Sequence, residues 1–485
     1  MPIRNLILFA LFALLAVPCG ATTYYLANAS TSPAGNDANN GTSAATPWLS
    51  PNHALNCGDV IIAAASTAYS NANFQPSKWG TVTCAGGNNV AWLECATAFA
   101  CQVNTTTGTN YSIVPGASYW GLQGWVAQNS STSGPPEGCI TVSPASTNIS
   151  HVIIANNIAE NCNGGGLGCC ANGGTASADY VAFIGNISYN NAAVNTGCNS
   201  GISINAPAAS DTLPGTHILV AGNFIWDTGN PAGCFDGEGI NLDTWDSYGG
   251  GPPNSYNQQG VVENNISISN SGPGIEIEYN NAGNGPSYAN IFIKNNTTWN
   301  NNINPNQYGN TPCGEIQLRQ TVKSYVTQNI TSTNTTGCFT DTGNGWYAYY
   351  VSHVDGTSFV YNNFGYAANS DYTGSDNATG FGFGPNNTFS NSTTGFVNPA
   401  TPSAPSCGGY TTTTSCMATV IANFTPTTAA AKAYGYQIPS TTSVYDPLYP
   451  QWLCTVTNLP TGLVTPGCVT GSAMNGATFS GGQIH

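Results

Sequence analysis

The chain has 485 residues, only 6% of them charged, and its 21 acidic residues against 6 lysines and arginines give a formal charge of −15. This balance excludes a basic nucleic-acid surface and disfavours binding to an anionic membrane. Because 41% of the residues are hydrophobic and many alternate with polar ones, the chain can bury a core and need not be disordered.

The first residues have the features of a secretory signal peptide. Arg4 precedes an apolar run from Leu6 to Val17, and Cys19-Gly20-Ala21 supplies small residues for cleavage. The run is too short to stay in a bilayer, and no later segment is long and apolar enough to span one. We expect residues 1–21 to be removed and the protein to be secreted, either extracellular or periplasmic, without membrane insertion. Cys19 would also suit a lipoprotein, which the sequence favours less.

Sixteen of the 17 cysteines follow this segment, and an even number in an exported chain predicts disulfides. Short spacing suggests the pairs Cys95/Cys101, Cys407/Cys416 and Cys454/Cys468. The pairing within a further cluster stays open: Cys162, Cys169, Cys170 and Cys198. A metal site is the less favoured interpretation, because no Cys-x-x-Cys pair occurs and the histidines lie far from the cysteines.

The next segment, residues 22–69, is predicted to form an N-terminal cap. It contains a strand at Tyr24–Leu26, a loop rich in Gly, Asn and Asp, a short helix near 51–55 and a second strand over 59–65.

Seven later segments repeat one pattern, in which an alternating strand is followed by a turn asparagine and a second strand. The repeats predict a solenoid over residues 70–395, because a unit of this kind buries its apolar face only against its neighbours. The intervals between the asparagines vary from 29 to 42 residues, which indicates loops of different length at one corner. The aligned asparagines are Asn157, Asn186, Asn223, Asn265, Asn296, Asn329 and Asn363.

The tail, residues 396–485, is richer in Thr and Pro and has one plausible helix at 428–434. The end of a solenoid exposes strand edges and an open core, so the tail is expected to cover that end. Its aromatic residues Tyr445, Tyr449 and Trp452 leave glycan binding as an alternative role.

The opening of the chain resembles a known group of proteins. The matching residues are Tyr24-Tyr25-Leu26, the loop from Gly35 to Thr42, Ala45-Thr46-Pro47-Trp48 and the strand from Gly58 to Ile62. They are similar to the start of exported right-handed parallel β-helix proteins, including family-9 polysaccharide lyases and relatives in the pectin-lyase superfamily. The resemblance implies an all-β, right-handed parallel β-helix with an asparagine ladder, an N-terminal cap and a C-terminal capping tail. The architecture hosts lyases, hydrolases, epimerases and adhesins, so the reaction must come from the site.

A second repeated strand brings polar residues together. Its apolar members should point inward and the alternate residues outward. One predicted outward row is Ser203, Asn241, Glu276 and Gln317, and the next is Asn205, Asp243, Glu278 and Arg319.

Seven of the 21 acids lie between positions 236 and 278, although the protein is otherwise almost uncharged. Like charges on adjacent strands repel, and a bound Ca²⁺ would compensate for them with oxygen ligands. The candidate ligands are Asp236, Glu238, Asp243, Asp246, Glu276 and Glu278. A solvated acidic patch balanced by Arg319 is the alternative.

Three functions compete. The resemblance favours a Ca²⁺-assisted polysaccharide lyase, in which Arg319 would remove the proton α to a uronate carboxyl; the superfamily includes lyases with an arginine or lysine base. Arginine needs a strongly perturbed pKa for this role. The chain departs from family 9 in having no lysine on the acid-bearing strand.

The second function is a glycoside hydrolase that uses two carboxyl groups. Asp243 and Glu278, one strand apart, would suit the short separation of a retaining enzyme. Asp243 with Glu276 or with Asp236 would suit the longer separation of an inverting one. Asn241, Gln317, Trp245 and Tyr279 would contact the sugar, and the negative charge suits a neutral or weakly acidic glycan. The third is a non-catalytic extracellular β-helix that binds a glycan. In each case the expected partner is an extracellular polysaccharide and the expected state a monomer.

Overall fold

The structure is a computed structural model. It describes residues 21–84, 89–107, 111–131, 138–170, 176–192, 199–229, 236–243, 245, 256, 258–278, 287–303, 314–319, 321–332, 347–352, 359–366, 370–375, 386–390, 395–437, 450–454, 456, 459, 479–480 and 483–484.

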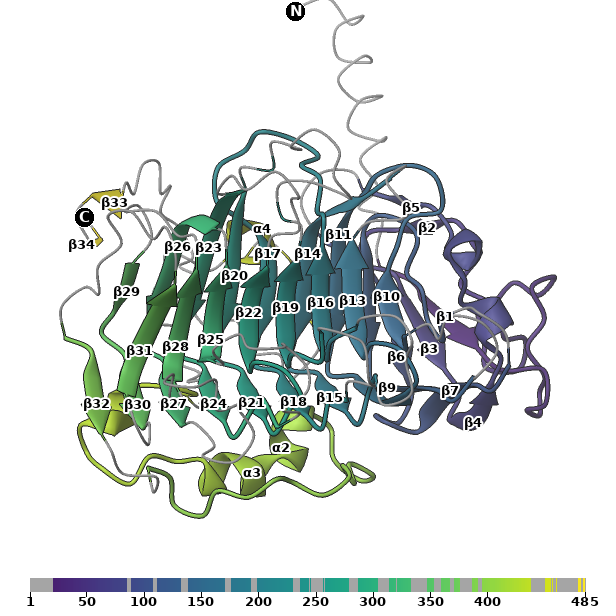
Figure 1. Ribbon diagram of the computed structural model, residues 1–485. Coiled ribbons are helices and arrows are strands. Elements are labelled where there is room, and N and C mark those ends of the chain that lie inside the picture. The colour runs from purple at the N-terminus through teal and green to yellow at the C-terminus, as the bar shows by residue number, and fades with distance from the viewer. Residues whose placement is uncertain are drawn as a thin grey trace, which may run out of the picture.

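The chain folds into a parallel β-helix with three long sheets, as predicted (Figure 1). Sheet 1 contains β1 (Thr23–Leu26), β3 (Val60–Ala63), β6 (Ala91–Cys95), β8 (Trp120–Gln123), β11 (Ile149–Ala155), β14 (Ala178–Ile184), β17 (Thr216–Ala221), β20 (Gln259–Glu263), β23 (Ser287–Lys294), β26 (Thr321–Thr327) and β29 (Phe359–Tyr361). Sheet 2 contains β10 (Ile140–Val142), β13 (Leu167–Cys170), β16 (Ile202–Asn205), β19 (Ile240–Asp243), β22 (Ile275–Glu278), β25 (Gly314–Arg319), β28 (Tyr347–Ser352) and β31 (Ser370–Ser375).

Sheet 3 contains β4 (Ser66–Tyr69), β7 (Cys101–Thr105), β9 (Trp125–Asn129), β12 (Ile158–Cys162), β15 (Ile187–Tyr189), β18 (Phe224–Trp226), β21 (Ile266–Ile268), β24 (Thr297–Trp299), β27 (Ile330–Ser332), β30 (Phe364–Tyr366) and β32 (Thr388–Ser390). Two short pairs complete the described strands: β2 (Leu55–Asn56) with β5 (Val82–Thr83), and β33 (Phe479–Ser480) with β34 (Gln483–Ile484).

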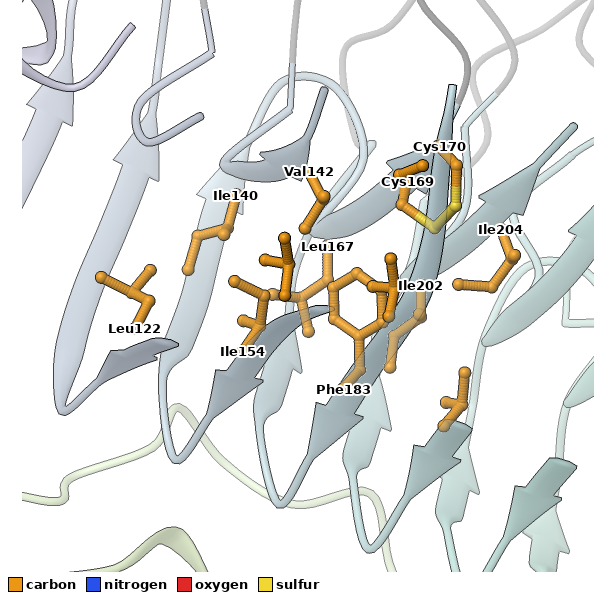
Figure 2. Packing of buried hydrophobic residues seen from close by; sticks show 14 of the residues in the cluster. Leu122, Ile140, Val142, Ile154, Leu167, Cys169, Cys170, Phe183, Ile202 and Ile204 are labelled. Atoms are coloured by element: carbon orange, nitrogen blue, oxygen red, sulfur yellow. A yellow bond between two sulfur atoms is a disulfide. The ribbon is translucent and has the colours of Figure 1, made fainter. Parts of the chain in front are cut away.

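From β10 onward each coil passes from sheet 2 to sheet 1 and then to sheet 3, so equivalent residues of successive coils stack in register. Figure 2 shows the result inside the helix, where aliphatic side chains from neighbouring coils form columns. One such column joins Leu122, Ile154 and Phe183, all fully buried. Strand alternation places these residues inward on every coil, which is why the apolar pattern recurs with each repeat.

The corner between sheets 1 and 3 explains the repeated asparagine. The residue before each ladder asparagine has a positive φ, for example 61° at Gly185 and 57° at Asn264. This left-handed conformation suits glycine and asparagine, which occupy most of these positions. The dipeptides Gly-Asn and Asn-Asn of the sequence therefore form one sharp turn in each coil.

The ladder asparagines hydrogen-bond from coil to coil. Asn223 Nδ2 and its backbone N–H both donate to Asn265 Oδ1, at 2.9 Å each, and Asn223 Nδ2 also donates to the Phe183 carbonyl. The pattern runs unbroken from Asn157 to Asn363 and continues to Asn387, which the sequence alignment missed. The turns can therefore be buried because their polar groups bond to one another.

The N-terminal segment joins the stack directly. Its predicted strands are confirmed as β1 and β3, which pair in sheet 1. The prediction of a helix near 51–55 is wrong. His53 instead stacks on Trp48 with ring centroids 3.8 Å apart, and the chain then enters β2. Short 3₁₀ turns follow at η1 (Asn71–Asn73) and η2 (Pro76–Lys78).

Two disulfides predicted from spacing are confirmed: Cys95–Cys101 and Cys407–Cys416. Three others appear in the described part of the chain: Cys57–Cys84, Cys139–Cys162 and Cys169–Cys170. Cys454 is also disulfide-bonded, but Cys468, its predicted partner, lies outside the described residues, as do Cys198 and the predicted signal peptide apart from Ala21.

The tail packs along the flanks of the stack. Its helices α2 (Thr413–Cys416) and α3 (Ala418–Asn423) and the 3₁₀ turn η3 (Ala431–Ala433) lie beside sheet 3 (Figure 1). Met417, Phe424 and Phe396 there cover an outer apolar row of the sheet. The members of that row include Ile158, Ile187, Phe224, Ile266, Ile330 and Phe364.

A later part of the tail covers sheet 1. Trp452 and Leu453 of α4 (Gln451–Cys454) pack with Val456 on an outer apolar row that includes Ile153, Leu219, Val261 and Phe292. Trp452 is therefore buried rather than exposed to a glycan, and Tyr445 and Tyr449 lie outside the described residues.

The tail also bonds to the ladder corner. Gln437 exchanges hydrogen bonds with Asn264, and the Gly435 N–H donates to the Gln328 carbonyl. Of the helix predicted over 428–434, only the 3₁₀ turn η3 forms. Among the described residues, no helix is long and apolar enough to cross a membrane.

We predict that Asn265→Ala destabilises the protein by at least about 3 kcal/mol, because it removes the acceptor of two buried hydrogen bonds from Asn223 and the donor of one to the Val220 carbonyl. Urea unfolding measures the change. The control Asn190→Gly removes one exposed bond, to Asn161, and keeps a positive φ; it should cost less than about 1 kcal/mol. Equal losses in the two variants would contradict the structural importance of the ladder.

Candidate functional site

The two polar rows predicted on sheet 2 are in the expected register. Asn241 pairs with Ser203 on one side and with Glu276 on the other, and Glu276 pairs with Gln317. In the second row Asp243 pairs with Asn205 and with Glu278. The intervening apolar residues are buried in the core, so the predicted division between inward and outward residues is confirmed where side chains are described.

The first row is buried even though it faces away from the core. Asn241, Glu276 and Gln317 are 2%, 0% and 3% exposed. Within the described part of the chain, the Asn241 Oδ1 atom has no hydrogen-bond partner. A buried acceptor without a donor is rare in folded proteins and is costly unless a ligand or ion satisfies it. Of the predicted calcium ligands, Glu276 is the one that pairs with Asn241, a residue that was predicted to contact the sugar. An amide oxygen and a carboxylate are both donors of the kind that Ca²⁺ takes.

The second row lies at the carboxyl ends of the strands and is more accessible. Asp243 is half-buried, and its Oδ2 accepts a hydrogen bond from Asn205 Nδ2 at 3.1 Å. Glu278 is the directly opposite residue on β22, and Arg319 is the residue after Leu318, which pairs with Ile277. The backbone therefore brings these three positions to adjacent strands, while the side chains of Glu278 and Arg319 lie outside the described part.

Glu238 does not belong to the same group. Its carboxylate is fully buried and accepts a hydrogen bond from Ser200 Oγ at 2.7 Å. It stands five residues before Asp243, which in extended chain is about 16 Å. Asp236 lies two residues farther back and is half-buried. Among the described residues, no group of three or more acidic, histidine or cysteine side chains is arranged to hold a metal ion.

Trp245 does not offer a face to a sugar. Its indole is 1% exposed, belongs to the main core and packs edge-on against Tyr256 at 5.2 Å. Gly260 lies under the ring so closely that a side chain there would collide with it. The stacking role predicted for Trp245 therefore does not fit its position. Tyr279 and Asp246 lie outside the described residues.

A buried histidine and a buried aspartate bond to each other between two adjacent strands of sheet 1, β17 and β14. His217 Nδ1 bonds to Asp179 Oδ1 at 3.0 Å, and Nε2 faces the Leu213 carbonyl at 3.0 Å. The His217 ring is also the last of a column of stacked rings from successive coils, in the order Tyr119, His151, Tyr180 and His217.

The Asp179 carboxylate remains ionised because of these neighbours. Burial raises the pKa of Asp179, but hydrogen bonds from His217, Ser210 and Tyr256 outweigh burial and leave that pKa below its usual value. Burial lowers the pKa of His151 to about 4, so this ring is neutral at physiological pH. Since His217 and Asp179 are almost fully buried, the arrangement stabilises the corner and does not face substrate.

Glu315, at the start of β25, is a buried acid that the sequence did not single out. Its carboxylate accepts bonds from the Asn301 N–H and from Asn301 Nδ2, at 2.9 and 2.6 Å. The equivalent residue is glycine in the four preceding coils of sheet 2: Gly166, Gly201, Gly239 and Gly274. Burial raises the pKa of Glu315 to about 7, although both bonds from Asn301 favour the ionised form.

We predict that Glu315 makes the protein less stable as pH rises from about 4.5 to about 7. In this window the folded state holds a proton that the unfolded state releases, so stability falls by up to about 3 kcal/mol. Urea unfolding at several pH values should show this slope in the parent and a smaller slope in Glu315→Gln. Glu94→Gln, on sheet 1, is the comparison. Burial also raises the pKa of Glu94, but this residue is only half-buried, so its variant should reduce the slope less than Glu315→Gln does. An identical slope in the parent and Glu315→Gln would refute the prediction.

Comparison with known proteins gives likenesses only at the level of solved structures. No family model and no curated relative matches the sequence. Pel9A, a pectate lyase, is 16% identical over 66% of this chain and 79% of its own, with a TM-score of 0.37. The lacto-N-biosidase of family GH136 from Eubacterium ramulus is 12% identical over 76% and 67%, with a TM-score of 0.45.

An alginate lyase from Paenibacillus is 15% identical over 67% of this chain and 92% of its own, with a TM-score of 0.37. The parallel β-helix described above rests on the strand pairing of this chain itself.

Proposed function

We propose that this protein is a secreted glycoside hydrolase that cleaves a neutral glycan at the end of sheet 2, with Asp243 and Glu278 as its catalytic carboxyl groups. The observation that carries the proposal is the register that pairs these two residues on adjacent strands. Neighbouring strands lie about 4.8 Å apart, and retaining glycosidases hold their two carboxyl groups about 5–5.5 Å apart. A one-strand separation therefore supports hydrolysis with retention of the anomeric configuration.

The surroundings of Asp243 support its role as the nucleophile. The Asn205 amide donates to Asp243 Oδ2, and a donor of this kind stabilises and orients a carboxylate. In the proposed reaction Asp243 attacks the anomeric carbon while Glu278 gives its proton to the leaving oxygen. Water then hydrolyses the glycosyl-enzyme, with Glu278 accepting the proton.

The distribution of basic residues supports a neutral substrate. Arg319 is the only lysine or arginine in the described strands of sheet 2, whereas Lys294 is on sheet 1 and pairs with Glu263 at 3.3 Å. The remaining lysines of the described chain lie elsewhere, at Lys78 in η2, Lys323 in β26 and Lys432 in η3. A polyuronate would bring further negative charge to a protein of formal charge −15 with little to attract it.

A calcium-assisted polysaccharide lyase is the second candidate, favoured by the buried Asn241 Oδ1 beside Glu276. Asn241, Glu276 and Asp243 would hold the ion, and Ca²⁺ bound there would neutralise the carboxylate of a uronate. Arg319 would be the base that removes the proton α to that carboxylate. In this case the end of sheet 2 would again be the site, with elimination in place of hydrolysis.

We predict that Asp243→Asn and Glu278→Gln each lower turnover at least about a hundredfold, since each removes a group that acts in the chemical step. The assay uses a panel of neutral glycans and polyuronates and follows new reducing ends, unsaturated-uronate absorbance and the anomer released. Hydrolysis without new absorbance and with retention supports the proposal. Unsaturated products would support the lyase. Glu94→Gln, on sheet 1, should keep parental turnover.

Parental turnover in both site variants would show that the site lies elsewhere. If the parent cleaves none of the glycans, the proposal of an enzyme fails and glycan binding becomes the better interpretation.

Calcium binding gives a separate prediction. If Asn241 and Glu276 hold Ca²⁺, calorimetry should detect binding to the parent, and Ca²⁺ should raise its melting temperature because a ligand of the folded state stabilises that state. Glu276→Gln should raise the Kd for Ca²⁺ at least tenfold and reduce the rise in melting temperature. Glu263→Gln, an acid in a similarly buried position on sheet 1, is the matched control. Unchanged binding in Glu276→Gln would remove this residue from the calcium site.

A further inference from the structure

We infer that Asn205 is a positioning residue for Asp243 and that the Cys169–Cys170 disulfide holds Asn205 in place. The inference rests on the proposed function, because it assigns a role to the neighbours of the proposed nucleophile. It concerns one row across three adjacent strands, in which Cys170 pairs with Asn205 and Asn205 pairs with Asp243.

The Asn205–Asp243 contact fixes the carboxylate. Nδ2 of Asn205 donates to Oδ2 of Asp243 at 3.1 Å across one strand spacing. A carboxylate is free to rotate about its Cβ–Cγ bond, and a donor held on one side restricts that rotation. Because attack requires the reacting oxygen to be aligned with the anomeric carbon, a small misplacement lowers the rate. Asn205 thus acts through Asp243 without needing to touch the substrate.

The setting of this contact distinguishes it from the main supports of the fold. Both Asn205 and Asp243 are half-buried, whereas the ladder asparagines are completely buried and each makes several bonds. A partly solvated hydrogen bond contributes modestly to stability. Its loss should therefore affect orientation more than folding.

The disulfide lies on the other side of Asn205. Cys169 and Cys170 are bonded to each other in β13, both are buried, and Figure 2 shows them beside Ile202 and Ile204 of the next coil. In the chain-entropy description a disulfide stabilises more as the loop it closes grows longer. A bond between successive residues closes the shortest loop there is, so its main effect is local. Both cysteines belong to the main core, so this effect is to stiffen the backbone of β13, with which Asn205 pairs.

The test compares Asn205→Ala, Asn205→Asp and the exchange Asn205→Asp with Asp243→Asn. Each single change at position 205 should lower kcat at least tenfold with KM within about twofold of the parent. The exchange puts an amide and a carboxylate back in contact, so the melting temperature of this double variant should be higher than that of Asn205→Asp. Activity should stay absent, because the carboxylate is then on the wrong strand.

Asn190→Asp is the matched control, since Asn190 also donates across one strand spacing, to Asn161 Oδ1 at 2.7 Å, but lies beyond sheet 3. It should leave kcat and KM unchanged. The double variant Cys169→Ala, Cys170→Ala tests the disulfide and should lower kcat about threefold or more at constant KM.

Several results would overturn the inference. Parental kcat in Asn205→Ala and Asn205→Asp, with Asp243→Asn inactive, would refute positioning and leave the proposed function intact. A loss of folding in both Asn205 variants would show a structural role only. Parental kcat in the cysteine double variant would remove the disulfide from the proposal. If Asp243→Asn itself retains turnover, the proposed function fails and this inference fails with it.

Discussion

The hydrogen bonds between side-chain amides of successive coils are the interaction on which this structure depends. A coil of this helix must turn sharply between sheets 1 and 3, and the turn leaves backbone groups inside the protein. The ladder asparagine satisfies them with one side chain, because its Oδ1 accepts from the N–H and Nδ2 of one neighbouring coil while its own Nδ2 donates to a carbonyl of that coil. The left-handed residue before each asparagine makes the turn possible.

The tail determines which face of the helix remains for function. Its apolar residues cover outer rows of sheets 1 and 3, where the row positions are themselves apolar. On sheet 2 the corresponding outer positions are polar or acidic, and no described tail residue belongs to a hydrophobic cluster there. The apolar or polar character of the outer rows therefore separates the two faces that the tail covers from the face that carries the proposed site.

The sequence was sufficient to predict the stacked coils because the features that build them are local and repeated. Alternation predicts which residues point inward, and the turn asparagine sets the alignment of the coils, so the pairing of Asp243 with Glu278 followed directly. The helices at 413–423 were missed because their residues include three threonines, which have low helix propensity, and only the Thr412 side chain, bonded to the Ser415 N–H, marks the start.

Other features depend on parts of the chain far apart in sequence. The Cys139–Cys162 disulfide joins the residue directly before β10 of sheet 2 to the last residue of β12 in sheet 3, which spacing does not reveal. The burial of Glu276 and Asn241 also escaped prediction, since alternation tells which way a side chain points but not what covers it. Trp245 was expected outside because it follows an acidic strand end. Beyond Asp243 the strand has ended, so alternation no longer applies and the indole enters the core.

The ladder has a consequence for how such a surface can vary in length. Each coil meets the next through the same amide contact, even though the coils differ in size by up to 18 residues, from 24 between Asn363 and Asn387 to 42 between Asn223 and Asn265. Duplication or deletion of one whole coil would therefore preserve both junctions. The polar face of sheet 2 would then lengthen or shorten in steps of about 4.8 Å, which offers evolution a way to match the reach of the protein to its target.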